Sequence, residues 1–270
     1  MHSLESLSLW VALIGYSLVC ILAMVGVVFG KRPEKMILAI AVAAVLLHSL
    51  AFGLRWARFG HVPLGSAFDM LSANIGGLML AVVYGYWRMP RMRAFAAVVM
   101  PVVIMLMAWM LLKPSTETSL PPTYYTVWLY IHVVFIKLFF GCAFIALGLS
   151  GIVLLRRAGL GGRFIGLPDD QALDGRAYRF MALGLIFDSL GVVAGALWAQ
   201  NAWGRYWSWD SLETWSLVTW LTIALSLHVR VPFKTSPVTN AWLIVAVFVI
   251  AFFTFFGIPF VSTAMHKGQI

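Results

Sequence analysis

The sequence predicts an all-α membrane protein, a polytopic bundle of about eight transmembrane helices, from three observations. First, 62% of the 270 residues are hydrophobic, only 11% are charged, and the mean hydropathy is +0.92. A soluble domain of this length carries more charge. Second, the apolar residues form runs of roughly 20 residues, which is the length that crosses a hydrocarbon core of roughly 30 Å. Third, the positive charges concentrate in alternate loops.

The apolar runs define the expected spans. The first run lacks a cleavage site of small residues, so we expect it to stay in the membrane. The fifth run is long, which predicts a tilted or protruding helix. The runs cover about residues 8–29, 36–54, 70–87, 94–112, 127–155, 180–200, 213–230 and 242–262.

Loop charge predicts the orientation of the bundle. Thirteen of the 19 Lys and Arg residues fall in one set of loops, five fall in the other, and Lys137 lies inside a span. Because positive loops stay in the cytoplasm, we expect both termini on the outer face. The longest inner loop, residues 156–179, is polar and contains glycines, so we expect a flexible connection there. The net charge of +9 is then loop charge, which points to membrane lipid and not to nucleic acid as a partner.

The two cysteines exclude some functions. Cys20 and Cys142 both lie in apolar runs and form no CxxC pair. A thiol-redox role and a disulfide framework are therefore not indicated. The sequence also lacks CxxCH, so this chain is not itself a covalent carrier of c-type haem.

The stretch WGRYWSWDSLETW, residues 203–215, is the most unusual feature of the sequence. Five of the 12 tryptophans fall between Trp203 and Trp220. An aromatic belt at headgroup depth is the simplest interpretation of a scattered tryptophan, but a belt does not need this density in one loop. Flat aromatic faces suit a flat, conjugated ligand, and Arg205 is placed to meet a carboxylate on its rim.

Two acids in this stretch predict the start of the seventh helix. Asp210 is followed three residues later by Glu213, which is the spacing of a helix cap and the third residue of the helix. On the alternative reading, both carboxylates only satisfy backbone N–H groups at the helix terminus.

The histidines are the next candidates. His132 and His266 are expected on the same side of the membrane as the tryptophan-rich stretch. Two imidazoles on opposite faces of a flat ring are what axial ligation of haem iron requires. His48 and His228 lie within spans, where ionisable residues are functional candidates by default. A lone histidine is, however, more often a hydrogen-bonded structural group.

Two further charges are expected inside the membrane. Lys137 in the fifth span and Asp188 in the sixth lie at nearly the same depth, at about 1.5 Å per residue. An unpaired charge in lipid is costly, so we predict that the two side chains pair.

Several segments together resemble one family, the CcsA (ResC) branch of System II cytochrome c biogenesis. The tryptophan-rich stretch is similar to that family's signature, which reads approximately WGxYWSWDPKETW. The resemblance covers roughly residues 40–270 and departs from the signature at Ser211 and Leu212. The other similar segments are RWARFGHVPLGSAFDML (55–71), YIHVVFIKLFFG (130–141), LHVR (227–230) and MHKG (265–268).

The resemblance implies a function: delivery of haem at or across the membrane and its presentation, reduced, for covalent attachment to the CxxCH of apocytochrome c. This chain would be the membrane subunit of a holocytochrome c synthase. The implied partners are a CcsB/ResB-like membrane protein and apocytochrome c, the implied ligand is haem b, and the location is the bacterial cytoplasmic (inner) membrane. Residues 1–270 would form a single haem-handling domain with its haem-binding segment, 201–215, on the outer face.

The resemblance also assigns roles to residues. His132 and His266 would ligate haem iron at the outer site, and His228 would be an axial ligand at an inner site whose second ligand comes from the CcsB-like partner. The haem-contacting residues of the tryptophan-rich segment would be Trp203, Gly204, Arg205, Trp207, Trp209 and Asp210.

Three alternatives remain open at the level of sequence. A CcmC-like protein loads haem onto a separate haem chaperone, but such proteins usually have six spans. A HemX-like protein keeps the fold as a regulator of haem metabolism without catalysing attachment. A generic small-molecule transporter would carry the tryptophans only as an aromatic belt.

Overall fold

A computed structural model describes residues 2–164 and 166–258 of the chain. These residues form eight α-helices with five shorter helical segments between or after them, and they contain no β-strand. The chain divides into two compact units. The first contains the residues up to Thr118 together with Leu154–Asp169, and the second contains Ser119–Val153 and the chain from Asp170 onward. The single haem-handling domain over residues 1–270 stays a prediction.

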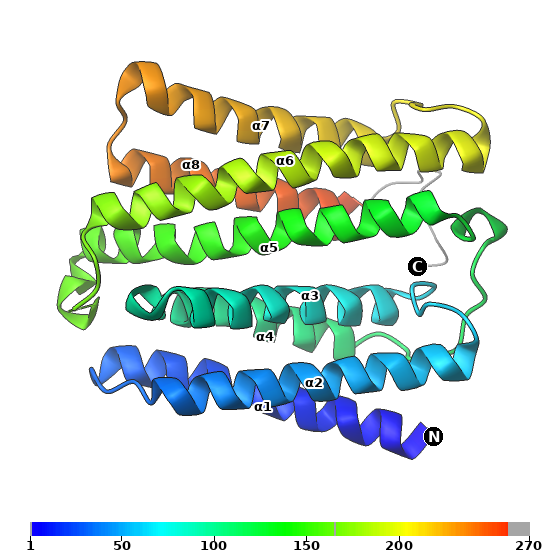
Figure 1. Cartoon of the computed structure of the whole chain (residues 1–270), viewed down its shortest axis with the longest axis horizontal. Coiled ribbons are helices and arrows are strands. Elements are labelled where there is room, and N and C mark those ends of the chain that lie inside the picture. The colour runs from blue at the N-terminus through cyan, green and yellow to red at the C-terminus, as the bar shows by residue number, and fades with distance from the viewer. Residues whose placement is uncertain (1, 165, 259–270) are drawn as a thin grey trace. The chain divides into compact units, whose positions relative to one another are not determined.

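The first unit is built from four helices that follow one another along the chain (Figure 1). They are α1 (His2–Val28), α2 (Glu34–Phe59), α3 (Ala67–Arg88) and α4 (Phe95–Leu111). The short helices η1 (Pro90–Met92), η3 (Arg156–Leu160) and η4 (Gly161–Phe164) complete it. Small residues bring α1 close to α2, because a Cβ atom on Gly15 would lie 2.7 Å from the Cβ atom of Ala44.

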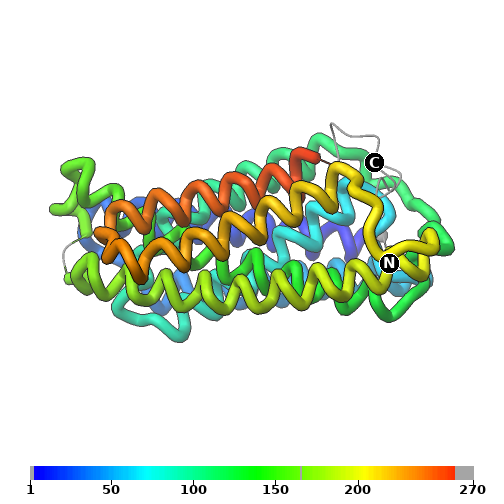
Figure 2. Tube along the Cα trace, turned by 90° about the horizontal axis from the view of Figure 1, so that it is seen from above, coloured from blue at the N-terminus to red at the C-terminus, as the bar shows by residue number. Residues whose placement is uncertain are grey.

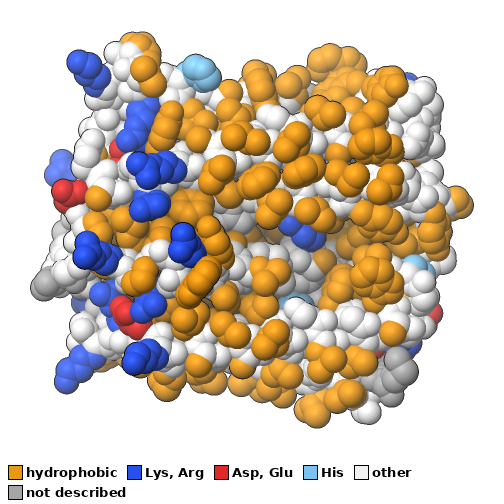
Figure 3. Space-filling view, in the orientation of Figure 1, with side chains coloured by type: hydrophobic (Ala, Val, Ile, Leu, Met, Phe, Trp, Pro, Cys, Tyr) orange, Lys and Arg blue, Asp and Glu red, His pale blue; other side chains and the backbone are white. Residues whose placement is uncertain are grey.

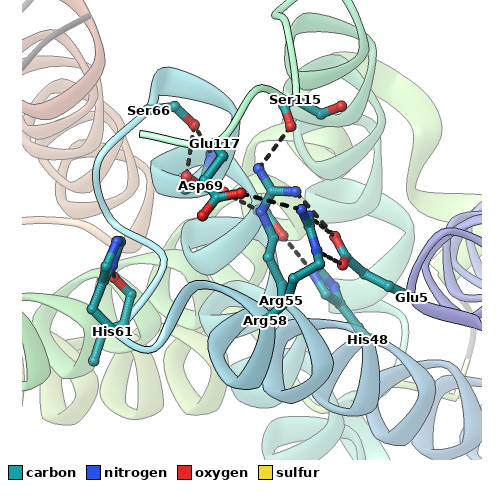
Figure 4. A network of polar contacts seen from close by, with 11 residues as sticks. Glu5, His48, Arg55, Arg58, His61, Ser66, Asp69, Ser115 and Glu117 are labelled. Atoms are coloured by element: carbon teal, nitrogen blue, oxygen red, sulfur yellow. Dashed lines mark hydrogen bonds and ion pairs between the residues drawn. The ribbon is translucent and has the colours of Figure 1, made fainter. Parts of the chain in front are cut away.

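Ion pairs mark the two ends of this unit. At one end Arg93, beside the α3–α4 connection, contacts Glu34 at the start of α2, with 2.6 Å between Nη1 and Oε2. The other end holds the polar network in Figure 4. Arg55 donates from Nε to Asp69 (2.6 Å), from Nη1 to Glu5 (3.0 Å) and from Nη2 to the carbonyl of Ser115 (3.0 Å). One guanidinium therefore joins α1, α2, α3 and the segment after α4.

The second unit contains α5 (Val127–Leu155), α6 (Asp170–Trp203), α7 (Ser211–Phe233) and α8 (Pro237–Phe252), with η2 (Pro122–Tyr124) and η5 (Phe253–Gly257). Figure 2 shows α7 and α8 running beside each other. Arg230 on α7 forms a two-pronged ion pair with Asp174 on α6, at 2.7 and 2.9 Å. Asn240 on α8 donates to the same carboxylate at 3.2 Å. This group closes the end of the unit opposite the α6–α7 loop.

The predicted membrane bundle is confirmed. Seven of the described helices are long and apolar enough to cross a membrane. The eighth, α4, has 17 residues, which span about 25 Å. Hydrophobic side chains cover the helices between their ends (Figure 3), and Leu46 and Leu225 are 65% and 63% exposed. Such outward apolar surface is what lipid requires.

One prediction about the connections is wrong. Residues 156–179 do not form a flexible loop, because α6 already begins at Asp170. Before it, Arg156 donates hydrogen bonds to the carbonyls of Phe164, Leu167 and Pro168. A guanidinium with five donors folds this polar segment back on itself.

The pairing of Lys137 with Asp188 stays a prediction. Asp188 is 1% exposed, and its Oδ2 atom forms no hydrogen bond among the described residues.

We predict that Arg55→Met lowers the free energy of unfolding by about 3 kcal/mol, because it leaves two buried carboxylates without their shared cation. The measurement is reversible unfolding of the detergent-purified protein. Arg91→Met, at an exposed position, is the control and should change stability by about 0.5 kcal/mol or less. Equal losses in the two variants would contradict the role of Arg55.

Candidate functional site

A cleft opens in the second unit beside the α6–α7 loop, which is yellow in Figure 1. Its empty volume is about 500 Å³, which includes open solvent at the mouth. Its lining comes from α5, α6, α7 with its preceding loop, and η5. The lining residues are His132, Ile136, Val192, Gly195, Ala196, Trp198, Tyr206, Trp207, Leu212, Glu213, Ser216 and Phe255.

His132 is held in one defined orientation. Its Nδ1 atom lies 2.8 Å from the carbonyl oxygen of Gly191 on α6. A carbonyl can only accept, so Nδ1 carries the proton and Nε2 carries the lone pair. The ring stacks on that of Trp198, with 6.2 Å between the ring centroids and 26° between the ring planes. Gly195 makes room for it, since a Cβ atom there would lie 2.8 Å from Nδ1. Ligating histidines are oriented by such a second hydrogen bond.

The tryptophan-rich loop begins where α6 ends. Gly204 has φ +77°, the left-handed conformation that terminates helices. Just before it, Trp203 packs edge-on against Trp198, with ring centroids 5.2 Å apart. Beyond it, Trp207 and Trp209 also meet edge to face, at 5.7 Å and 84°. The rings thus form two edge-to-face pairs, Trp198 with Trp203 and Trp207 with Trp209. The first pair includes Trp198, on which the His132 ring stacks.

Asp210 and Glu213 fasten this loop to α7. The Asp210 side chain accepts from the backbone N–H of Glu213 at 2.9 Å, so the predicted helix cap is confirmed. In return, Oε2 of Glu213 accepts from the backbone N–H of Ser208 at 2.6 Å and from its hydroxyl at 3.1 Å. This arrangement is a widened capping box, because Glu213 accepts from a residue that lies two positions before the cap and not from the cap itself.

Two buried polar atoms in the cleft wall have no hydrogen-bond partner among the described residues. They are Nε1 of Trp207, which can only donate, and Oε1 of Glu213. Glu213 is 7% exposed. Leaving such groups unsatisfied costs about 1–3 kcal/mol each. The cleft therefore favours a molecule that brings both an acceptor and a donor.

The structure places the predicted site residues in three groups. His132 and Trp207 share the cleft, and Trp203 lies behind it against Trp198. Four others surround the cleft without lining it: Gly204 and Arg205 are exposed, Trp209 is 69% exposed, and Asp210 caps α7. His228 is exposed near the far end of α7, where its Nδ1 donates to the carbonyl of Ala224 at 2.7 Å. His266 lies outside the described residues.

The histidines of the first unit have different surroundings (Figure 4). His48 is 3% exposed, and both of its nitrogens are used, by the hydroxyl of Tyr16 (3.1 Å) and by that of Ser72 (2.9 Å). It is therefore a structural histidine. His61 contacts the carbonyl of Val62 at 3.0 Å and packs on Phe59.

Sequence reasoning missed three features of the cleft. Trp198 was hidden because a tryptophan near the end of an apolar span usually belongs to an aromatic belt. Glu213 was assigned only to the helix terminus. Gly191 and Gly195 gave a usable signal, because two glycines one turn apart leave a strip of helix that another side chain can approach closely.

Known proteins are similar to this sequence. Residues 65–266 match the model of a family described as "Cytochrome C assembly protein". The chain is 27% identical to "Cytochrome c biogenesis protein CcsA" of Guillardia theta, over 98% of this chain and 94% of that protein. It is 31% identical to the protein of the same name from Synechococcus sp. (strain CC9902), over 74% of this chain and 75% of the relative. The protein of the same name from Chlamydomonas reinhardtii is 29% identical, over 82% of this chain and 65% of that protein.

The backbone of Trp209 provides a test of how this loop is held. Its φ is +59°, which costs an L-residue about 1–2 kcal/mol. We predict that Trp209→Gly is more stable than Trp209→Ala by about 1 kcal/mol, measured by unfolding in detergent. The same two substitutions at Trp207, which has no positive φ, serve as the control. There the order should reverse, because glycine loses more backbone entropy on folding. The same order at both positions would rule out strain at Trp209.

Proposed function

This chain belongs to the cytochrome c assembly protein family, and from that membership we propose that it binds haem b in the cleft beside His132 and presents it for attachment to apocytochrome c. Its function is in cytochrome c biogenesis, as the family and the CcsA relatives show. The family match includes all the residues of the cleft. The binding segment 201–215 and the individual ligands are the parts that we propose.

The observation that carries the proposal is the orientation of His132. Its Nδ1–H is bound to the Gly191 carbonyl at 2.8 Å, so the lone pair is on Nε2, the nitrogen that ligates iron in this tautomer. A neutral imidazole with its other N–H held by a carbonyl is the usual arrangement of a metal-bound histidine. Trp198, stacked on the ring, limits its rotation.

The rest of the cleft suits an amphipathic porphyrin. Apolar side chains from α5, α6 and η5 supply surface for the ring, and the indole N–H of Trp207 is a buried donor in need of an acceptor. A propionate carboxylate is such an acceptor. Arg205 is exposed in the same loop and would meet a second propionate at the rim.

We assign the remaining ligands by resemblance and surroundings. His266 would supply the second ligand at the outer site. His228 would ligate haem at an inner site, completed by a CcsB/ResB-like partner. Its exposure on α7 and its hydrogen bond to Ala224 support this role, since another protein can reach the side chain and Nε2 again carries the lone pair.

Attachment is the addition of two apocytochrome cysteine thiols to the two vinyl groups of the haem. Each thioether forms when a cysteine sulfur of CxxCH bonds to one vinyl carbon of the reduced haem and the thiol proton is added to the other carbon. The protein would act in the bacterial cytoplasmic membrane as the membrane subunit of a holocytochrome c synthase. Its own residues would hold the ring and leave the vinyl groups accessible from the outer face.

The alternative haem-handling functions are not favoured. The relatives are CcsA proteins, and the chain has eight helices among its described residues, where CcmC-like proteins usually have six spans. A HemX-like regulator would not need an oriented histidine in a cleft with unsatisfied polar atoms.

The reduced-minus-oxidised visible spectrum of the purified protein tests the proposal. We expect a sharp b-type α-band in the wild type that is lost in His132→Ala and restored by added imidazole. His61→Ala is the matched control and should keep the band. A wild-type protein without haem, even when co-expressed with a CcsB/ResB-like partner, would refute the proposal.

Gly195→Ala tests the position of the ligand without removing it. The new methyl group would lie within 3.0 Å of two atoms of the His132 ring, so we expect displacement of the ring and at least about tenfold weaker haem binding. Gly175→Ala on the same helix, where a Cβ atom meets nothing within 4 Å, should bind haem normally. Titration of the apoprotein with haem measures both, and equal affinities would contradict the assigned position.

A further inference from the structure

We propose that Glu213 is a positioning residue whose Oε1 atom accepts the ring N–H of the imidazole that ligates the iron on the face away from His132. The inference rests on the proposed haem site and assigns a role to a carboxylate that the helix cap alone does not explain. Only one of its two oxygens serves the cap.

The two oxygens of Glu213 have different surroundings. Oε2 accepts two hydrogen bonds from Ser208, at 2.6 and 3.1 Å. Oε1 is buried and has no hydrogen-bond partner among the described residues, and Glu213 is one of the residues that line the cleft. A residue that only capped α7 would leave its second oxygen in water, where desolvation costs nothing.

Glu213 acts as a hydrogen-bond acceptor. Both hydrogen bonds to Oε2 come from donors on Ser208, and the residue occupies the first turn of α7. Oε1 is therefore an acceptor. The cleft needs a donor at this point, and a propionate cannot supply one because it is itself an anion.

An axial imidazole supplies this donor. A histidine that binds iron through one nitrogen presents an N–H on the other, and this N–H is normally held by a carbonyl or a carboxylate. On the α5 side the carbonyl of Gly191 holds His132 in this way. On the α7 side Glu213 offers the equivalent acceptor. The imidazole can come from His266 or from the CxxCH histidine of the apocytochrome.

A pair of small ligands isolates this hydrogen bond. Imidazole and 1-methylimidazole both bind iron, but only imidazole keeps an N–H. In haem-loaded His266→Gly protein, we expect imidazole to bind more tightly than 1-methylimidazole. Glu213→Gln should reduce this preference at least about tenfold, since a hydrogen bond to a charged group contributes about 1.5–3 kcal/mol. Soret titration measures both affinities.

Ser208→Ala is the matched control, because it removes a contact to Oε2 and leaves Oε1 in place. It should keep the preference for imidazole. Glu213→Gln should also raise the midpoint potential of the haem, because a carboxylate acceptor makes the imidazole a stronger donor to ferric iron, whereas Ser208→Ala should not. Glu213→Asp, which shortens the reach of the carboxylate, is the second variant if Glu213→Gln does not fold, and it should lose the preference too.

The same titration identifies the source of the imidazole. If the preference appears only after His266 is removed, His266 is the natural ligand. If it appears in the intact chain, the position is open to the partner, and a CxxCH peptide should bind more tightly than the same peptide with Nδ1-methylhistidine. Equal preferences with Glu213 and with Glu213→Gln would overturn the inference and leave Oε1 to water. Failure of the wild type to bind haem would instead refute the proposed function.

Discussion

The reciprocal cap between Asp210 and Glu213 is the interaction on which the arrangement of the site depends. It fixes the first turn of α7 and, through Ser208, the loop that carries the tryptophans. Without it, the backbone N–H of Glu213 at the start of α7 would need another acceptor, and Ser208 in the loop would lose both of its hydrogen bonds to Glu213. The left-handed backbone of Trp209 persists because both of its neighbours, Ser208 and Asp210, are held.

In both units, charged side chains near the helix ends form groups in which one cation has several partners. The guanidinium of Arg55 has three partners on different segments, and that of Arg230 joins α6 and α7. Burial of either charge would be prohibitive alone. These two groups sit near helix ends, where they fix the connections between segments.

The wall of the cleft differs from these closed groups. Elsewhere a buried histidine such as His48 has a partner on both nitrogens. In the cleft, a donor on Trp207 and an acceptor on Glu213 remain open. The contrast separates the packed surroundings of His48 from the wall of the cleft. Solvent exposure would not distinguish these two environments as clearly, because exposed apolar surface is ordinary in a membrane protein.

The sequence by itself determined the all-α class, the order of the spans and the cap at Asp210, because these follow from hydropathy, charge and spacing along one segment. It also made candidates of His132 and the tryptophan-rich loop, and the structure brings His132 and Trp207 to one cleft. Only the tertiary structure decided that Trp198 stacks on His132, that Gly191 selects its tautomer and that one oxygen of Glu213 is buried without a hydrogen-bond partner among the described residues. The helical ordering of residues 170–179, taken for loop, likewise depended on partners elsewhere, since Asp174 is held by Arg230 and Asn240. Such contacts join residues 56 to 66 positions apart, and no local pattern specifies which side chains meet across that distance.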